Sequence, residues 1–166
     1  MNMNTRPDKD QYYLTIALAV SQRSTCLRRH YGSVIVKNDH IVSTGYNGAP
    51  RSCINCSDIG ECIRIKKQVA HNTDYTECKA VHSEQNAIIQ ANHLDLQDAT
   101  LYLAGYDVEA GQNVDSIDCC PLCKRMIINS GIKTVIMLQH DQTAKIVPVR
   151  NWIHEINFGI GFINES

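Results

Sequence analysis

Two successive helix-then-strand patterns fill the second half of the chain and constrain its fold more than any other feature. Residues 82–94 have helical spacing and precede the β-rich stretch 99–106. Residues 120–131 repeat this arrangement, with Gly131 as a helix stop signal before the β-branched stretch 132–138. The apolar positions at helical spacing are Ala87, Ile88, Ala91 and Leu94 in the first unit and Leu122, Met126 and Ile127 in the second. Helices that alternate with strands favour one sheet with helices packed on its faces.

The first half of the chain predicts a helix followed by a β-hairpin. Asp8 is a suitable N-cap for a helix with a broad apolar face. Residues 31–37 and 40–47 are β-rich, and Asn38 and Asp39 between them are typical of a two-residue hairpin turn. The apolar face of the helix consists of Tyr12, Tyr13, Ile16, Leu18, Ala19 and Val20.

The order of elements predicts an α/β fold in which a mixed sheet forms the middle of a layered sandwich. Residues 48–76 have neither helical nor strand periodicity, and a connection of this length is usually functional, disordered or held by a ligand. We expect a single domain over residues 1–166. Its core, insertion and C-terminal extension cover about 10–140, about 48–78 and about 141–166, respectively. In the extension we expect a strand and a short helix that packs through Trp152 and Ile156.

The charge balance argues against a protein that coats nucleic acid or an anionic membrane. The chain has 16 Lys and Arg against 17 Asp and Glu, a formal net charge of -1. No apolar run approaches the roughly 20 residues that span a bilayer, and the polar N-terminal stretch lacks the layout of a signal peptide. We therefore expect a cytoplasmic protein with neither a membrane nor a nucleic-acid partner.

Eight cysteines in a chain expected in a reducing compartment favour metal binding or catalysis over disulfides. Their positions form two groups. The first group precedes or flanks the helix that begins at His82 and contains Cys26, Cys53, Cys56, Cys62 and Cys78. The second is the tight cluster of Cys119, Cys120 and Cys123.

The pair Cys120 and Cys123 lies at the start of a predicted helix, where backbone amides and the helix dipole favour thiolates. His82, at the start of the other helix, can supply a third zinc ligand and leave one tetrahedral position for water. Glu84 can meet the same centre only from the first helical turn, because residues two apart do not share a helix face. There its carboxylate can take a proton from the water and pass it on.

Each half of this constellation has a simpler explanation when taken alone. A His-x-Glu at a helix start commonly caps the helix and compensates its dipole. A lone Cys-x-x-Cys is redox-active in some proteins and structural in others. Together, with a helix, a strand and a loop between them, the two motifs are far more specific for a catalytic zinc.

Zinc nucleobase deaminases carry His-x-Glu followed by Pro-Cys-x-x-Cys, and "HSEQNAI" with "CCPLCKRMIINSGI" resembles this pair. Upstream, "SQRSTCLRRHYGSVIVKNDHIVSTGYNGAP" resembles the deoxycytidylate (dCMP) deaminases in particular, including their bacterial late-competence and phage branches. The resemblance runs from about residue 10 to about residue 140. Two positions depart from the family pattern. Ser83 stands where the family usually has Ala, and Cys119 stands where it usually has Pro, with Pro121 after Cys120.

The resemblance implies hydrolytic removal of the cytosine amino group, which converts dCMP into dUMP and ammonia and feeds thymidylate synthesis. Water activated on zinc attacks C4 of the pyrimidine, and Glu84 protonates N3 and later the departing amine. The resemblance also implies the three-layer α-β-α cytidine-deaminase sandwich and a homo-oligomer, either a hexamer or a dimer.

The remaining cysteines are either small buried apolar residues or ligands of a second zinc that fixes the insertion. Resemblance to the family branch with a second zinc matches Cys26, Cys56, Cys62 and Cys78 to its ligands. His71 is a substitute for one of them, because some relatives use a His in the insertion. Cys53 forms a Cys-x-x-Cys with Cys56 but falls where the family has no matching ligand.

Substrate contacts are less constrained by the sequence. The resemblance matches Asn47 in "GYNGAP" to a residue that contacts the substrate sugar, although an Asn in a Gly-flanked turn is an equally good explanation. It also places the backbone amide of Ser83 opposite the pyrimidine carbonyl. The 5′ phosphate requires a cation, for which Arg28, Arg29, Arg51 and Lys79 are candidates and Arg28 is our choice. Activation by dCTP with Mg²⁺ and inhibition by dTTP follow from similarity alone.

Two other functions compete with this one. Another zinc deaminase, acting on tRNA adenosine, cytidine or cytosine, would use the same centre, but a tRNA enzyme normally carries a basic stripe. A non-catalytic zinc module of a DNA-uptake system would have no use for Glu84 beside an open zinc position.

Overall fold

The computed structural model describes residues 6–70, 73 and 75–159. Its centre is a mixed β-sheet with the strand order β2-β1-β3-β5-β6, and β4 pairs with β3. The strands β3 and β5 run parallel, whereas the other neighbours run antiparallel. The strands are β1 (Arg29–Lys37), β2 (His40–Tyr46), β3 (Thr100–Asp107), β4 (Gln112–Asn113), β5 (Thr134–Leu138) and β6 (Ala144–Pro148). The predicted α/β fold with one mixed sheet is confirmed.

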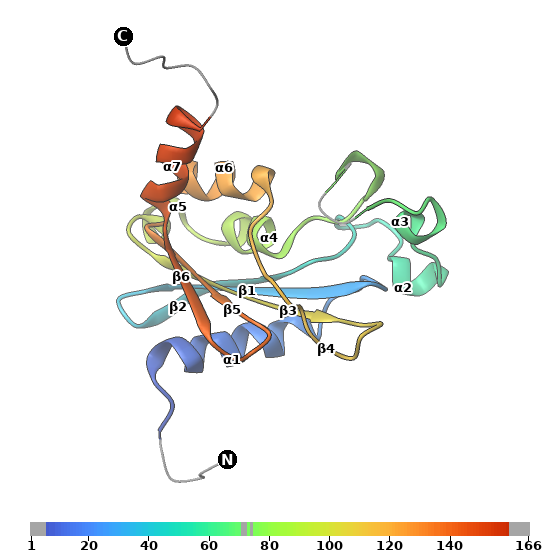
Figure 1. The fold of residues 1–166 in the computed structure, drawn as a ribbon, viewed down its shortest axis with the longest axis horizontal. Coiled ribbons are helices and arrows are strands. Elements are labelled where there is room, and N and C mark those ends of the chain that lie inside the picture. The colour runs from blue at the N-terminus through green and yellow to red at the C-terminus, as the bar shows by residue number, and fades with distance from the viewer. Residues whose placement is uncertain (1–5, 71–72, 74, 160–166) are drawn as a thin grey trace.

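Helices cover both faces of this sheet (Figure 1). Helix α1 (Lys9–Ser21) lies on one face. Helices α4 (Ser83–Gln90) and α6 (Pro121–Ser130) lie on the other face and contact one another. Helix α7 (Val149–Phe158) follows β6 and packs beside α6. The three layers are therefore α1, the sheet, and the α4–α6 pair.

Two glycines let helices approach the sheet closely, one on each face. A Cβ atom at Gly32 on β1 would lie 2.0 Å from the carbonyl oxygen of Ala17 in α1. A Cβ atom at Gly45 on β2 would lie 2.3 Å from both the Ser83 carbonyl oxygen and the Ala87 amide nitrogen in α4. Since backbone atoms cannot yield to a side chain here, glycine is required at both positions. The close approach at Gly45 fixes the first turn of α4 against the sheet.

The local signals for helix and turn boundaries are confirmed. Asp8 caps α1 by accepting a hydrogen bond from the Gln11 amide. Asn38 and Asp39 both have positive φ, as a two-residue hairpin turn requires. Gly131 ends α6 in the left-handed conformation. The predicted helix over 82–94 is shorter than expected, because α4 ends at Gln90 and Asn92 caps the separate short helix α5 (His93–Leu96).

Several apolar residues point away from the core, contrary to prediction. In α1 the buried apolar residues are Tyr13, Leu14 and Ala17, whereas Tyr12 and Ala19 are exposed. This helix is apolar on most of its circumference, so periodicity alone does not select its buried face. Three further residues assigned to packing faces are exposed, namely Leu94, Leu122 and Ile156. Trp152 in α7 is buried as predicted.

The predicted insertion has little regular structure. It contains the single-turn helices α2 (Cys56–Ile59) and α3 (Ile63–Lys66) and the 3-10 turn η1 (Tyr75–Glu77). Helix α2 has no buried residue, and α3 buries only Arg64. The described part of this insertion therefore lacks an apolar core of its own comparable to that around the sheet.

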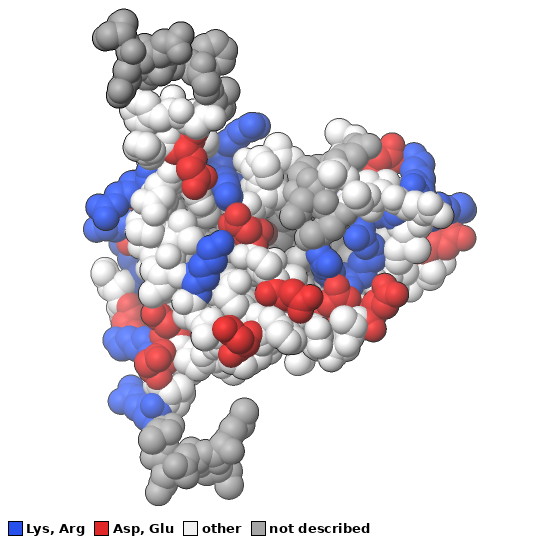
Figure 2. All heavy atoms as spheres, in the orientation of Figure 1, with Lys and Arg blue, Asp and Glu red and all other residues white. Residues whose placement is uncertain are grey.

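Lys and Arg side chains are interspersed with Asp and Glu side chains on the face shown in Figure 2. Among the described residues, we find no helix that is both long and apolar enough to cross a membrane.

Candidate active site

His82 is the N-cap residue of α4. Its backbone is extended, with φ -74° and ψ 157°, and its amide donates a hydrogen bond to Gln85 Oε1 at 2.9 Å. This bond is one half of a capping box, which fixes the position of His82 at the start of α4. Gly48 and Val81 form an isolated bridge just before the cap, which ties the approach to α4 to the end of the hairpin.

Cys120 is the N-cap residue of α6 and resembles His82 in backbone conformation, with φ -66° and ψ 159°. Its Sγ accepts a hydrogen bond from the Cys123 amide at 3.4 Å, and Pro121 occupies the first helical position. Proline there has the φ a helix requires and lacks the N–H that would go unbonded. Pro121 thus starts the helix although the usual family Pro is replaced by Cys119, which is buried.

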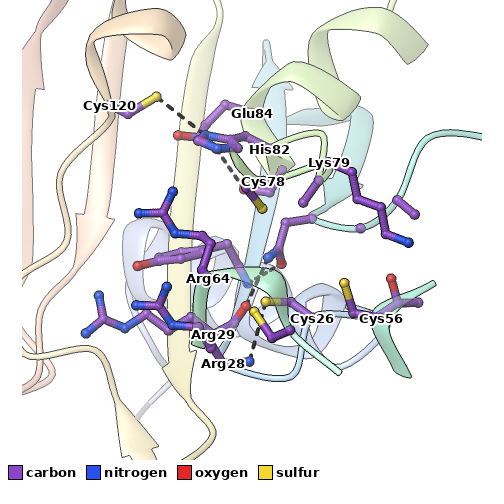
Figure 3. A pocket seen from close by; sticks show the side chains of 18 of the residues that line it. Cys26, Arg28, Arg29, Cys56, Arg64, Cys78, Lys79, His82, Glu84 and Cys120 are labelled. Carbon is purple, nitrogen blue, oxygen red and sulfur yellow. Dashed lines mark hydrogen bonds between the residues drawn. The ribbon is translucent and has the colours of Figure 1, made fainter. Parts of the chain in front are cut away.

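The two helix starts bring three potential metal ligands together. His82 Nδ1 lies 3.4 Å from Cys120 Sγ and 3.4 Å from Cys123 Sγ, and Figure 3 marks the first of these contacts. All three ligand atoms lie within 4.8 Å of one another. Within residues 6–70, 73 and 75–159, this is the only group of three or more His, Cys, Asp or Glu residues with that geometry.

The spacing of these atoms fits a tetrahedral zinc. Zinc–nitrogen bonds of about 2.1 Å and zinc–sulfur bonds of about 2.3 Å place neighbouring nitrogen and sulfur ligands about 3.6 Å apart. The observed 3.4 Å separations lie close to that value. One His and two Cys ligands leave a fourth position, which is the arrangement of catalytic rather than structural zinc sites.

The thiols of this cluster differ in pKa. The hydrogen bond from the Cys123 thiol, helped by His82, lowers the pKa of Cys120 to about 4. The same hydrogen bond, together with burial, raises the pKa of Cys123. The contact with Cys120 also raises the pKa of His82. The two thiols therefore titrate as a coupled pair, in which Cys120 loses its proton first.

Glu84 lies in the first turn of α4 and is 5% exposed. Its Oε2 accepts a hydrogen bond from the Ser83 hydroxyl at 3.0 Å, and Ser83 Oγ in turn accepts one from Ser33 Oγ at 2.8 Å. Ser33 and Ser83 are both fully buried. The side chain of Ser83 is thus directed into the protein, toward the central strand β1.

His82, Cys120 and Glu84 lie at one end of a pocket that several cationic side chains also line (Figure 3). Arg28, Arg29, Arg64 and Lys79 all line it. Arg51 is not among the lining residues, so the structure separates it from the other predicted phosphate candidates. Among the described residues, Thr25 Oγ1 and Arg29 Nη1 are buried side-chain atoms without a hydrogen-bond partner, and both residues line this pocket.

Arg64 is a pocket residue that the sequence analysis missed. Its Nη2 donates to the carbonyl oxygens of Ala70 and Thr73, at 2.6 and 2.7 Å. It is 8% exposed, and its positive charge opposes the rise in the pKa of His82. Residues 48–76 have no periodicity from which its direction could be predicted. The only available signal was the presence of an arginine in an insertion expected to be functional, disordered or held by a ligand.

Asn47 lines the pocket, but most of the hydrogen bonds of its side chain are made to other residues of the protein. Its Oδ1 accepts hydrogen bonds from Ser24 Oγ at 2.7 Å and the Tyr31 amide at 2.7 Å, and its Nδ2 donates to the Arg29 carbonyl oxygen at 2.9 Å. Three of the four hydrogen-bonding positions of this amide thus hold the turn in place.

The four cysteines predicted to hold a second zinc all line the same pocket. They are Cys26, Cys56, Cys62 and Cys78. Burial raises the pKa of the Cys56 thiol, Lys79 opposes this rise, and the other three thiols increase it further. The four thiols are thus neighbours, although no three of their sulfur atoms lie within 4.8 Å of one another. Cys53 is exposed, and His71 lies outside the described residues.

The chain matches known proteins over most of its length. Residues 7–139 match the family model described as the cytidine and deoxycytidylate deaminase zinc-binding region. The deoxycytidylate deaminase of Mycobacterium phage D29 is 38% identical over 136 residues, which cover 80% of this chain and 95% of that protein. The deoxycytidylate deaminase of Saccharomyces cerevisiae is 34% identical, over 81% of this chain but 38% of the yeast protein.

A solved structure has the same fold. The apo crystal structure of dCMP deaminase from the cyanophage S-TIM5 superposes with a TM-score of 0.56 and 25% identity, covering 81% of this chain and 86% of that one. A second structure of that enzyme, in complex with dCMP and dUMP, has the same TM-score at 24% identity. The three-layer deaminase sandwich is thereby confirmed.

Proposed function

This chain belongs to the cytidine and deoxycytidylate deaminase family, and from that premise we propose that it hydrolyses dCMP to dUMP and ammonia. The observation that carries the proposal is the convergence of His82, Cys120 and Cys123, two of which line a pocket together with Glu84 and several cationic side chains. The phage relative, whose length this chain covers almost completely, bears the name of that activity.

We assign His82 Nδ1, Cys120 Sγ and Cys123 Sγ as the ligands of a catalytic zinc. When bound, zinc lowers the pKa of a water ligand to about 7 and so supplies a nucleophile at neutral pH. The protein contributes the close placement of the three ligand atoms at the starts of α4 and α6. Helix N-termini on both sides of the centre stabilise the negative charge of the ligands.

Glu84 carries the protons of the reaction. Its carboxylate accepts a proton from the attacking water as the oxygen–C4 bond forms, and it delivers that proton to N3 of the ring. It then takes the second proton of the former water and gives it to the amino group, which leaves as ammonia when the C4–N4 bond breaks. Glu84 ends the cycle ionised, as it began. Its position beside the ligand cluster, 5% exposed, protects this transfer from bulk water.

Pocket cations favour a nucleotide over a nucleoside or a free base. We propose that the 5′ phosphate binds among Arg28, Arg29 and Arg64, because guanidinium groups match phosphate oxygens in charge and geometry. Arg29 donates to Asp107 Oδ2 through Nε at 2.9 Å, and its buried Nη1 has no hydrogen-bond partner within the described ranges, so Nη1 is the donor that we assign to the phosphate. Asn47 then has one N–H left with which to contact the sugar. The backbone amide of Ser83 is the proposed donor to the pyrimidine carbonyl.

We also propose a second, structural zinc held by Cys26, Cys56, Cys62 and Cys78. Support comes from their common place in the pocket wall, their mutual electrostatic influence and the small amount of buried surface in the insertion. An ion would draw the sulfurs to tetrahedral spacing and stabilise a segment that lacks a core.

Regulation, assembly and location rest on resemblance alone. Activation by dCTP with Mg²⁺, inhibition by dTTP, a homo-oligomer and a cytoplasmic location are proposed on that basis. Turnover measured with and without each triphosphate, together with the molar mass in solution, tests the first three.

The mechanism is tested by Glu84→Gln, which replaces the proton carrier with a side chain of the same shape. We expect zinc content equal to that of the wild type and a loss of dUMP formation of at least about 1000-fold, since general acid–base catalysis is lost at more than one step. Retained turnover would remove Glu84 from the mechanism. Activity of the wild type on tRNA adenosine or on no cytosine or adenine compound would instead favour the competing functions.

A further inference from the structure

We propose that Ser83 and Ser33 are positioning residues that hold the Glu84 carboxylate in one orientation. The inference rests on the proposed function, because it concerns the residue that carries the protons. Ser83 was expected to act through its backbone amide, and this proposal gives its side chain a separate role.

The three side chains form a buried chain of hydrogen bonds that runs from the sheet to the reacting centre. Ser33 Oγ on β1 lies 2.8 Å from Ser83 Oγ at the start of α4, and Ser83 Oγ lies 3.0 Å from Glu84 Oε2. Ser33 and Ser83 are 0% exposed and Glu84 is 5% exposed. Water therefore does not compete for these contacts.

Proton counting fixes the direction of this chain. An ionised Glu84 has no hydrogen to donate, so the only hydrogen of the Ser83 hydroxyl must point toward Oε2. Ser83 Oγ can then only accept from Ser33, whose hydroxyl becomes the donor. Since Ser33 belongs to a strand paired on both sides, with β2 and β3, the chain ends on a rigid part of the molecule.

This arrangement distinguishes the two oxygens of the carboxylate. Oε2 is held by Ser83, and Oε1 is left for the proton that moves between water, ring nitrogen and amine. Because a hydrogen bond to a charged group is stronger than one between neutral groups, the orientation is retained while Glu84 is ionised. A carboxylate that rotates freely would spend less time aligned with the reacting atoms.

Ser43 provides a matched control on the same helix. Its Oγ donates to the Ala87 carbonyl oxygen of α4 at 2.7 Å and it is 9% exposed. Like Ser33, it links a strand to α4 through a buried hydroxyl. Unlike Ser33, it donates to a backbone carbonyl one helical turn beyond Ser83, so its loss tests for a general effect of loosening this helix.

The test compares zinc-loaded wild type with Ser83→Ala, Ser33→Ala, the double variant and Ser43→Ala. Loss of the Ser83 hydroxyl should lower kcat for dCMP by about tenfold to about 100-fold while KM changes by less than about twofold. The double variant should have the low kcat of Ser83→Ala but a higher Tm, because it no longer buries a Ser33 hydroxyl without its acceptor. Ser43→Ala should lower Tm and keep kcat within about twofold of wild type.

A crystal structure of the Ser83→Ala variant provides a readout that does not depend on turnover. The Glu84 carboxylate should occupy more than one orientation, or one that differs from the wild type. An unchanged kcat in Ser83→Ala, or a kcat that recovers with Tm in the double variant, would overturn the proposal. If the zinc-loaded wild type has no dCMP activity, the proposed function fails, and the crystal structure still decides whether Ser83 positions Glu84.

Discussion

The His82–Cys120–Cys123 cluster and the four cysteines around the insertion lie near the same pocket, which His82, Cys120 and those four cysteines line, but they are held by very different parts of the fold. The first cluster lies at the N-termini of α4 and α6, two helices packed on the sheet. Two of the other four cysteines, Cys56 and Cys62, lie at the starts of the single-turn helices α2 and α3. The first cluster already has its ligand atoms within 4.8 Å, and the second does not.

The difference shows what a scaffold contributes to a metal site. Where helix ends are fixed by a sheet, the packing itself places the ligand atoms close together. Where the chain has little buried surface, the ion itself must supply the cohesion. We therefore expect loss of a ligand to affect chemistry in the first cluster and stability in the second.

The largest effect is expected from Cys120→Ala. Zinc content should fall by one ion per chain and dUMP formation by at least about 1000-fold, because the activated water is lost with the metal. The fold should survive, since Pro121 and the packing of α6 remain. Zinc analysis, dUMP assay and thermal unfolding measure the three results. Unfolding of the purified variant at room temperature would show that this cluster, too, depends on its ion for cohesion.

A smaller effect on activity is expected from Gly45→Ala, which keeps every proposed metal-ligand side chain and changes only how α4 packs on the sheet. The new Cβ would force the first turn of α4 away from β2, at a cost of about 1–3 kcal/mol. We expect kcat for dCMP to fall by about tenfold or more, because His82 and Glu84 move with that turn.

The matched control is Gly32→Ala, which meets α1 on the opposite face of the sheet. It should destabilise the protein by a comparable amount and leave kcat near that of the wild type. Equal losses of kcat in both variants would mean that global stability, rather than the place of α4, limits activity.

Cys62→Ser is expected to affect stability more than chemistry. With the second zinc lost, the free energy of unfolding should fall by about 3 kcal/mol, which lowers Tm by roughly 6–12 °C in a chain of this size. The kcat should stay within about threefold of the wild type, because the ligands on α4 and α6 are unchanged. Zinc analysis and thermal unfolding test this. A wild type with one zinc per chain would refute the second site.

The smallest effect is expected from Cys53→Ser. The side chain is exposed and is absent from the lining of the pocket, so stability should change by less than about 0.5 kcal/mol. Zinc content and kcat should equal those of the wild type. A fall in zinc content would place Cys53, rather than one of the other four, in the second ligand set.

The sequence was most informative where local chemistry determines the structure. Asp8, the Asn38–Asp39 turn and Gly131 each favour a particular backbone conformation, and the elements they bound were predicted within a few residues. The convergence of His82 with Cys120 and Cys123 was also predictable, because two helix starts on one sheet leave few alternatives. Leu94 and Ile156 were wrongly predicted to pack against the core. The exposure of a residue on a helix depends on which other element packs on that face, and helical periodicity does not identify that element.

Two features of the site depend on three-dimensional packing and could not be predicted. Arg64 reaches the pocket from an aperiodic segment, and its direction is determined by carbonyl groups at residues 70 and 73. The Ser33–Ser83 contact joins residues 50 positions apart. It depends on the close approach of α4 to the sheet, which Gly45 permits. No local sequence pattern predicts this approach.

The most direct test of the account is the kcat/KM of the zinc-loaded protein for dCMP compared with deoxycytidine and cytosine under the same conditions. The account predicts turnover of dCMP with a kcat/KM at least about 100-fold above that for deoxycytidine, because the phosphate contacts to arginine are lost without the 5′ phosphate. Equal values for the two compounds would contradict the role of the pocket cations. No turnover of dCMP by a protein with full zinc occupancy would contradict the proposed function itself.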